Sequence, residues 1–83
     1  MKYRAKIEVS LKPGHSNPEG ETTARLLNEL GYKVEAVDVS KVYTVTLDAG
    51  SVKEAKAKAE EMSRRLLANT NKDNYTVSFE EQQ

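Results

Sequence analysis

His15 is the only histidine among the 83 residues of the chain, which contains no cysteine. A thiolate metal site, a thiol nucleophile and a disulfide framework are therefore excluded, and a lone histidine is far more often a solvated residue than a ligand or base. No serine lies in a Gly-x-Ser-x-Gly motif, and Gly14 and Gly20 are not spaced as in a phosphate-binding loop. The residues predict a chain without catalytic residues, metal ligands or a cofactor of its own.

The most constrained stretch runs from residue 11 to residue 20. Pro13-Gly14 favours a turn, because proline presets φ and glycine accepts a positive φ. Asn17-Pro18-Glu19 predicts a helix start, with an N-cap, a proline at the first helical position and an acid at the positive end of the dipole. Gly20 costs a helix about 1 kcal/mol relative to alanine, which suggests that something approaches its backbone closely. A well-punctuated loop without further function is the alternative interpretation.

The composition limits the class of partner. Thirteen basic residues balance 13 acidic residues, which argues against a nucleic-acid or anionic-membrane surface. The length predicts one domain over residues 1–83, small enough that association with another copy would help to stabilise it. The sequence shows no secretory signal and no apolar run long enough to span a bilayer, so we expect a cytoplasmic protein.

Hydrophobic periodicity predicts six elements. Alternation over residues 3–11 predicts a half-buried strand, and a 3.6-residue period predicts a helix from Pro18 to Leu30 that Gly31 ends. Residues 32–47 predict two strands joined by a turn at Ser40-Lys41. A capping box at Ser51 and Glu54 starts a second helix, a last strand covers residues 75–79, and the polar tail 80–83 is expected to fray. The apolar stripe of the second helix is Val52, Ala55, Ala59, Met62 and Leu66.

The element order β-α-β-β-α-β predicts an α+β fold with two layers. The right-handed crossover rule favours a ferredoxin-like four-stranded antiparallel sheet with both helices on one face. RNA-binding domains share this order, but they stack bases on aromatic side chains of the open sheet face. That face here is polar, β-branched and small, so it is expected either to meet water or to pack on a second copy. Its residues are Lys6, Glu8, Ser10, Val42, Thr44, Thr46, Thr76 and Ser78.

Several short motifs, in order and spacing, resemble the PurS family, the small subunits of phosphoribosylformylglycinamidine (FGAM) synthase. They are VSLKPG at residues 9–14, NPEG at 17–20, LGY at 30–32, and LLAN at 66–69 after Met62 and before Tyr75. The chain departs from the family pattern at three positions. The family usually has aspartate where this chain has Asn17, glycine where it has Ser40, and proline where it has Thr70.

The resemblance implies an assembly role within FGAM synthase. The expected partners are a PurL-like synthetase subunit, which binds ATP and magnesium, and a PurQ-like glutaminase subunit, together with further copies of the chain as a dimer or tetramer. The family's small subunit carries no catalytic residues of its own. The residues that we expect to contact a partner are Lys12, Pro13, Gly14, Asn17, Pro18, Glu19, Gly20 and Asn69.

A regulatory ACT-type module that binds a small molecule, such as an amino acid, is the alternative. It has the same element order, and Lys12-Pro13-Gly14 and Leu30-Gly31 fit its pattern too. The continuation of the loop through residues 17–20 is longer than an ACT turn.

Overall fold

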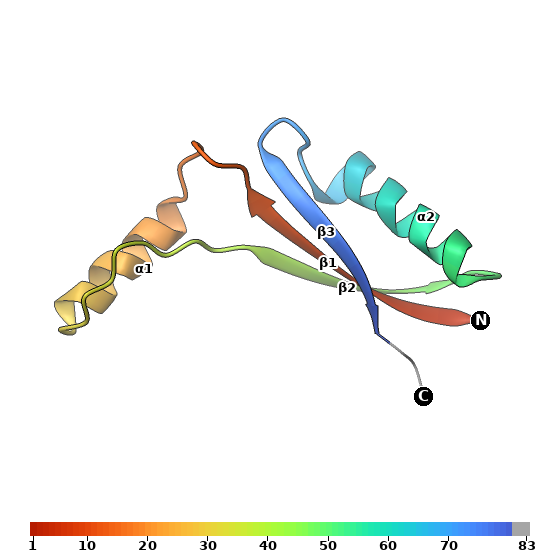
Figure 1. Cartoon of the computed structure of the whole chain (residues 1–83), viewed down its shortest axis with the longest axis horizontal. Helices are drawn as coiled ribbons and strands as arrows, with labels where there is room; N and C mark the ends of the chain where they lie inside the picture. The colour runs from red at the N-terminus through yellow and green to blue at the C-terminus, as the bar shows by residue number, and fades with distance from the viewer. Residues whose placement is uncertain (81–83) are drawn as a thin grey trace.

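The structure is a computed structural model that describes residues 1–80. Three strands alternate with two helices, and the second helix continues into a short π-helix (Figure 1). Residues 81–83, where most of the predicted fraying tail falls, lie outside the described residues, whereas Glu80 ends the last strand. The elements are β1 (Lys2–Leu11), α1 (Pro18–Glu29), β2 (Lys41–Asp48), α2 (Val52–Met62), η1 (Ser63–Leu67) and β3 (Asp73–Glu80).

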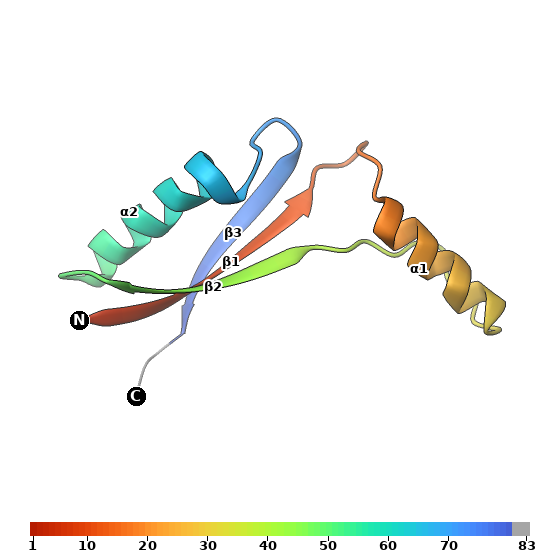
Figure 2. The same ribbon diagram turned by 180° about the vertical axis from the view of Figure 1, so that it is seen from behind.

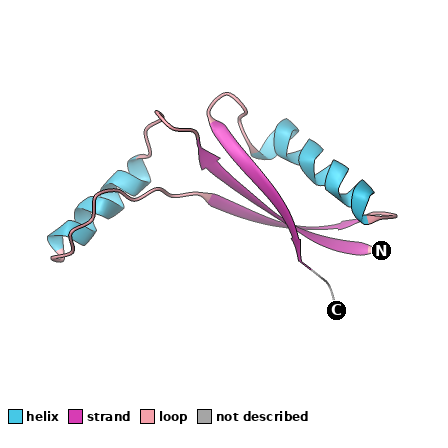
Figure 3. Ribbon diagram, viewed as in Figure 1, coloured by secondary structure: helices cyan, strands magenta, loops and turns pink. Residues whose placement is uncertain are grey.

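The three strands form one antiparallel sheet in the order β2-β1-β3 (Figure 3). Ile7 in the central strand lies opposite Tyr43 of β2 and Val77 of β3. This register places the apolar residues of all three strands on one face, as the period-two pattern requires.

The predicted ferredoxin-like, four-stranded sheet is wrong in two respects. Residues 32–40 form no strand in the described structure, so the sheet has three strands and β2 begins at Lys41 without a hairpin turn before it. The helices also do not share one face of the sheet. Helix α1 projects away from the strands, with residues 32–40 running beside it (Figures 1 and 2).

Side chains of α1 and of its N-cap residue hold residues 32–40 outside the sheet. The side chain of Asn28 donates to the carbonyl oxygen of Val34 over 3.1 Å and accepts from its N–H over 3.0 Å. The side chain of Asn17 donates to the carbonyl oxygen of Val39 over 3.2 Å. Backbone groups that a fourth strand would pair across a ladder are thus satisfied by asparagine side chains instead.

The hydrophobic core lies between α2 and the sheet. Ala55 and Ala59 of α2 are fully buried against Ala5 and Ile7 of β1, and the small alanines allow the helix to come close. Helix α2 lies closest to β1 and β3. The apolar side chains of the two outer strands are less well covered than those of β1, since Tyr43 and Val45 of β2 and Val77 of β3 are only partly buried.

The helices begin and end at the predicted capping residues, with one difference in the hydrogen bonds. Asn17 caps α1, Gly31 adopts φ 102°, and Ser51 Oγ accepts from the N–H of Glu54 over 3.1 Å. The Glu54 carboxylate, however, accepts from the N–H of Gly50 over 2.9 Å, one residue before the predicted cap position.

The predicted apolar stripe of α2 is only partly buried. Val52 is 57% exposed and Leu66 is 83% exposed. In η1 the N–H of Ala68 donates five residues back to Ser63, which rotates the last turn and turns Leu67 rather than Leu66 toward the core.

Candidate partner-binding site

The loop after β1 is fastened to the loop before β3. Lys12 donates its backbone N–H to Lys72 over 2.7 Å and its ammonium group to the carbonyl oxygen of Thr70 over 2.9 Å. Gly14 follows with φ 90°, the left-handed conformation that the predicted turn requires. The structure therefore brings Lys12 and the region of Asn69 together, although they are far apart in the sequence.

Asn69 organises the second of these loops. Its side-chain oxygen accepts from the N–H of Asn71 over 3.0 Å, and its backbone N–H donates to the carboxylate of Asp73 over 2.9 Å. These bonds form an Asx turn that leads into β3. The role of Asn69 that the structure displays is thus to shape the loop against which Lys12 is held.

Asn17 stands where α1 joins the sheet. Its side-chain oxygen accepts from the N–H of Gly20 over 2.9 Å, and its amide reaches Val39 in the returning segment. We call residues 12–17 and 38–40 the neck, because these two segments connect α1 to the sheet (Figure 1). Asn17 bonds one segment of the neck to the other.

Gly20 is buried for a reason internal to the chain. A Cβ placed on Gly20 would overlap the carbonyl oxygen of Val37 and lie 2.9 Å from its carbonyl carbon. The sequence correctly predicts a close backbone approach at this position. The atoms that approach belong to residues 32–40 of the same chain.

The remaining predicted residues are exposed. Pro13, Gly14, Pro18 and Glu19 lie at the surface of the neck and of the first turn of α1. Two hollows flank the neck, with volumes of about 580 and 270 Å³, and both are lined by Ser10, Leu11, Asn17 and Val39. The predicted set thus divides into residues that build the neck and residues that a partner can reach.

Sequence reasoning missed the acceptors in residues 34–39 and the role of Asn28. Backbone carbonyls carry no sequence signal, so the partners of Asn17 and Gly20 could not be named. A signal for Asn28 did exist, because an asparagine in the last turn of a helix is a poor helix former that bonds readily to backbone groups.

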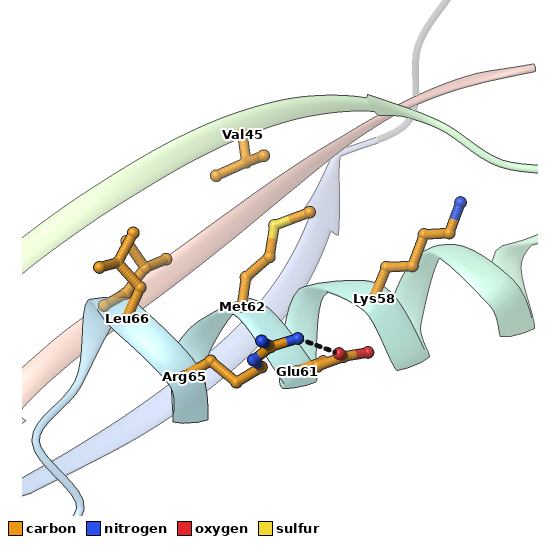
Figure 4. A pocket seen from close by; sticks show the side chains of 7 residues that line it. Val45, Lys58, Glu61, Met62, Arg65 and Leu66 are labelled. Atoms are coloured by element: carbon orange, nitrogen blue, oxygen red, sulfur yellow. Dashed lines mark hydrogen bonds and ion pairs between the residues drawn. The ribbon is translucent and has the colours of Figure 1, made fainter.

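A second missed feature is an apolar groove at the edge of the core. It has a volume of about 420 Å³ and lies beside α2 and η1, with Val45 of β2 across from Met62 and Leu66 (Figure 4). The exposed Leu66 is part of this groove. The periodic pattern predicts that Leu66 is buried with the rest of the stripe, so the sequence does not predict this groove.

Two carboxylates, one in α2 and one in β3, have lowered pKa values. A hydrogen bond from the backbone of Gly50, with the ammonium of Lys58 nearby, lowers the pKa of Glu54. The ammonium of Lys6, assisted by Arg4, lowers the pKa of Glu80. Both carboxylates bond to neighbours within the chain, so they stabilise α2 and the β1–β3 pair. Within residues 1–80 no group of three or more His, Asp or Glu side chains is arranged to hold a metal ion.

Among the described residues, no helix is long and apolar enough to cross a membrane.

Similarity to known proteins extends over nearly the whole chain and is not confined to the neck. A family model described as PurS, phosphoribosylformylglycinamidine (FGAM) synthase, matches residues 4–81. The chain belongs to the PurS family. The match confirms the resemblance of the short motifs and favours it over the ACT-type alternative.

Relatives within the PurS family match over nearly their whole length. The chain is 40% identical over 81 residues to the phosphoribosylformylglycinamidine synthase subunit PurS of Methanothermobacter thermautotrophicus, covering 98% of this chain and 96% of the relative. It superposes on Thermus thermophilus PurS with a TM-score of 0.89 at 33% identity, covering 100% of both chains. A chain in the structure of PurLQS from Thermotoga maritima has the same fold, with a TM-score of 0.88 at 23% identity, covering 96% of this chain and 99% of that one.

Proposed function

We propose that this chain is the small, non-catalytic subunit of an FGAM synthase in purine biosynthesis. It holds a PurL-like synthetase subunit and a PurQ-like glutaminase subunit together, so that ammonia from glutamine reaches formylglycinamide ribonucleotide. The family match over residues 4–81 carries this proposal. The PurLQS structure, which contains a chain of the same fold, supports the choice of partners.

The chemistry of the reaction belongs to the partners in this proposal. ATP and magnesium bind to the synthetase subunit, and the glutaminase subunit releases the ammonia. We place the complex in the cytoplasm, where its soluble substrates are. The contribution of this chain is to position the other two subunits.

The exposed part of the neck, together with the first turn of α1, is the proposed contact with a partner. Lys12, Asn17, Gly20 and Asn69 use their polar groups or their backbone within the chain, so they fix the shape of the neck. Pro13, Gly14, Pro18 and Glu19 are the exposed members of the predicted set. A preformed loop with little freedom to lose is suited to recognition, because binding then costs less conformational entropy.

Reconstitution tests this role. The chain is mixed with PurL-like and PurQ-like subunits from the same source, and FGAM formation is measured with glutamine and, separately, with ammonia as the nitrogen donor. We expect the chain to raise the glutamine-dependent rate far more than the ammonia-dependent rate, and to co-purify with both subunits. Equal glutamine-dependent rates with and without the chain would refute the proposal.

A matched pair of variants tests the neck. Pro13→Arg places a long cation on the exposed loop, and Ala57→Arg places the same group on the exposed outer surface of α2. We expect Pro13→Arg to weaken co-purification at least tenfold while Ala57→Arg leaves it unchanged. Equal binding by both variants would show that partners do not use the neck.

A further inference from the structure

Helix α1 is bonded to the segment that returns from it toward the sheet. The side chain of Asn28 exchanges two hydrogen bonds with the backbone of Val34. The side-chain amide of Asn17 donates to the carbonyl oxygen of Val39, the last residue before Ser40. Hydrogen bonds near both ends of α1 thus tie the helix to residues 32–39, and the two segments form a single bonded unit.

The turn that precedes α1 is bonded to the sheet side of the neck instead. The ammonium group of Lys12 donates to the carbonyl oxygen of Thr70, and the carbonyl oxygen of Lys12 accepts from the N–H of His15 over 3.3 Å. Residues 12–15 are therefore a closed turn that is fastened to the loop before β3. On the other segment of the neck, Lys41 is the first residue of β2 and pairs with β1.

Ser16 and Ser40 are the two residues left between these bonded parts, one on each segment of the neck. Both are exposed. Within the described part of the chain, no hydrogen bond or ion pair joins residues 17–39 to residues 1–15 or 41–80. Helix α1 also has no extensive contact with any other described helix or strand. The backbone at the two serines is thus the main connection between α1 and the sheet (Figure 1).

Open space lies on both sides of this connection. The hollow of about 580 Å³ is lined in part by Glu8 and Asp38, and the hollow of about 270 Å³ is lined in part by Tyr43 and Leu67. Glu8 and Tyr43 belong to opposite faces of the sheet, since Tyr43 packs against the core and Glu8 is exposed. Helix α1 therefore has room to tilt toward either face.

We propose that the neck is a hinge at Ser16 and Ser40, about which α1 and residues 32–39 tilt together relative to the sheet. Hinges are a few loop or element-terminal residues that absorb the change in φ and ψ, and both serines lie in such places. Each side of the neck keeps its own shape while the angle between the two sides changes. Two connecting segments restrict twisting, so tilting is the expected motion.

The hinge divides the proposed contact with a partner, a consequence that rests on the proposed function. Pro13 and Gly14 belong to the turn on the sheet side, whereas Pro18 and Glu19 belong to α1. A partner that touches both pairs of residues binds some hinge angles better than others and shifts the population toward them. Binding of a synthase subunit at the neck then sets the direction of α1.

Distances between two spin labels in frozen solution test the hinge, because the natural chain contains no cysteine. Labels at Arg25→Cys on α1 and Lys56→Cys on α2 span the neck, whereas labels at Thr46→Cys on β2 and Lys56→Cys do not; all three positions are exposed. Each labelled chain is diluted with excess natural chain, so that only distances within one chain are measured. We expect the distance distribution across the neck to be at least about twofold wider than the other one.

Glycine variants show whether the two serines are the hinge residues. Ser16→Gly and Ser40→Gly add backbone freedom at exposed positions, so each should widen the distribution across the neck further. Thr70→Gly is the matched control, because it adds similar freedom to an exposed loop that does not connect α1 to the sheet. We expect this control to leave the distribution unchanged.

A distribution across the neck as narrow as the one between β2 and α2 would overturn the hinge, and so would equal widening by Thr70→Gly. Addition of PurL-like and PurQ-like subunits should narrow the distribution across the neck. An unchanged width in a sample where both subunits co-purify with the labelled chain would overturn the link between partner binding and the direction of α1. The measurements on the chain without partners are independent of the outcome of reconstitution.

Discussion

Different interactions hold the two helices in place. Apolar burial holds α2, since Ala55 and Ala59 are fully buried against the sheet. Polar bonds hold α1, since Asn17 and Asn28 bond to the backbone of residues 34–39. Leu26 of α1 and Leu30 at its C-cap stay exposed. The strands with α2 and η1, which we call the sheet half, therefore have a buried core, whereas α1 with residues 32–40, which we call the arm, does not depend on one.

The largest effect should come from the core of the sheet half. Ile7 is fully buried in the central strand, so Ile7→Ala removes its contacts and leaves a cavity. We expect a loss of about 2–5 kcal/mol in the free energy of unfolding. Urea denaturation at one fixed protein concentration measures it.

Val42→Ala is the matched control for Ile7→Ala. Val42 lies on β2 and is 57% exposed, so its truncation should change stability by no more than about 0.5 kcal/mol. Similar losses in both variants would mean that the face between α2 and the sheet is not the stabilising core.

A smaller and more local effect should come from Gly20. Helix propensity alone predicts that Gly20→Ala stabilises the chain by up to about 1 kcal/mol. The position of Val37 predicts the opposite, because the added methyl group overlaps its carbonyl and must push residues 34–39 away. We expect a cost of about 1–3 kcal/mol, confined to the arm.

Hydrogen exchange locates that cost. Amides of α1 should lose protection in Gly20→Ala, whereas those of β1 should keep theirs. Thr22→Ala, on an exposed position of the same helix, is the control and should slightly raise the protection of α1. A uniform loss over β1 and α1 would show that the arm and the sheet half unfold together.

The same contrast shows what the sequence could and could not predict. Period-two and 3.6-residue patterns located the three strands and both helices, and Asn17, Gly31 and Ser51 ended or began helices as predicted. The fourth strand failed because Val34, Val37 and Val39 have strand propensity, while the partners of their backbone groups are decided by tertiary contacts. Gly20 was singled out correctly, yet no local rule identifies the backbone that approaches it.

The smallest effect should be a pH dependence that belongs to the sheet half. The carboxylates of Glu54 and Glu80 have pKa values below the ordinary 4.5 because the folded chain bonds to their charged forms. Their contribution to stability is complete above the ordinary value and is lost as the pH falls through the lower folded values. Stability should therefore fall below about pH 5.

Glu54→Gln isolates one of these groups. Its amide oxygen can still accept from the N–H of Gly50, so the cap of α2 keeps a hydrogen bond while the titrating group is removed. Both carboxylates lie at the surface, where solvent screens the bonds, so the change in slope should be modest. Urea denaturation of the natural chain and of Glu54→Gln between about pH 5 and pH 3 should show a shallower pH dependence in the variant. Equal slopes would mean that Glu54 has the same pKa in the folded and unfolded chain, and that its bond to Gly50 adds nothing to the stability of α2.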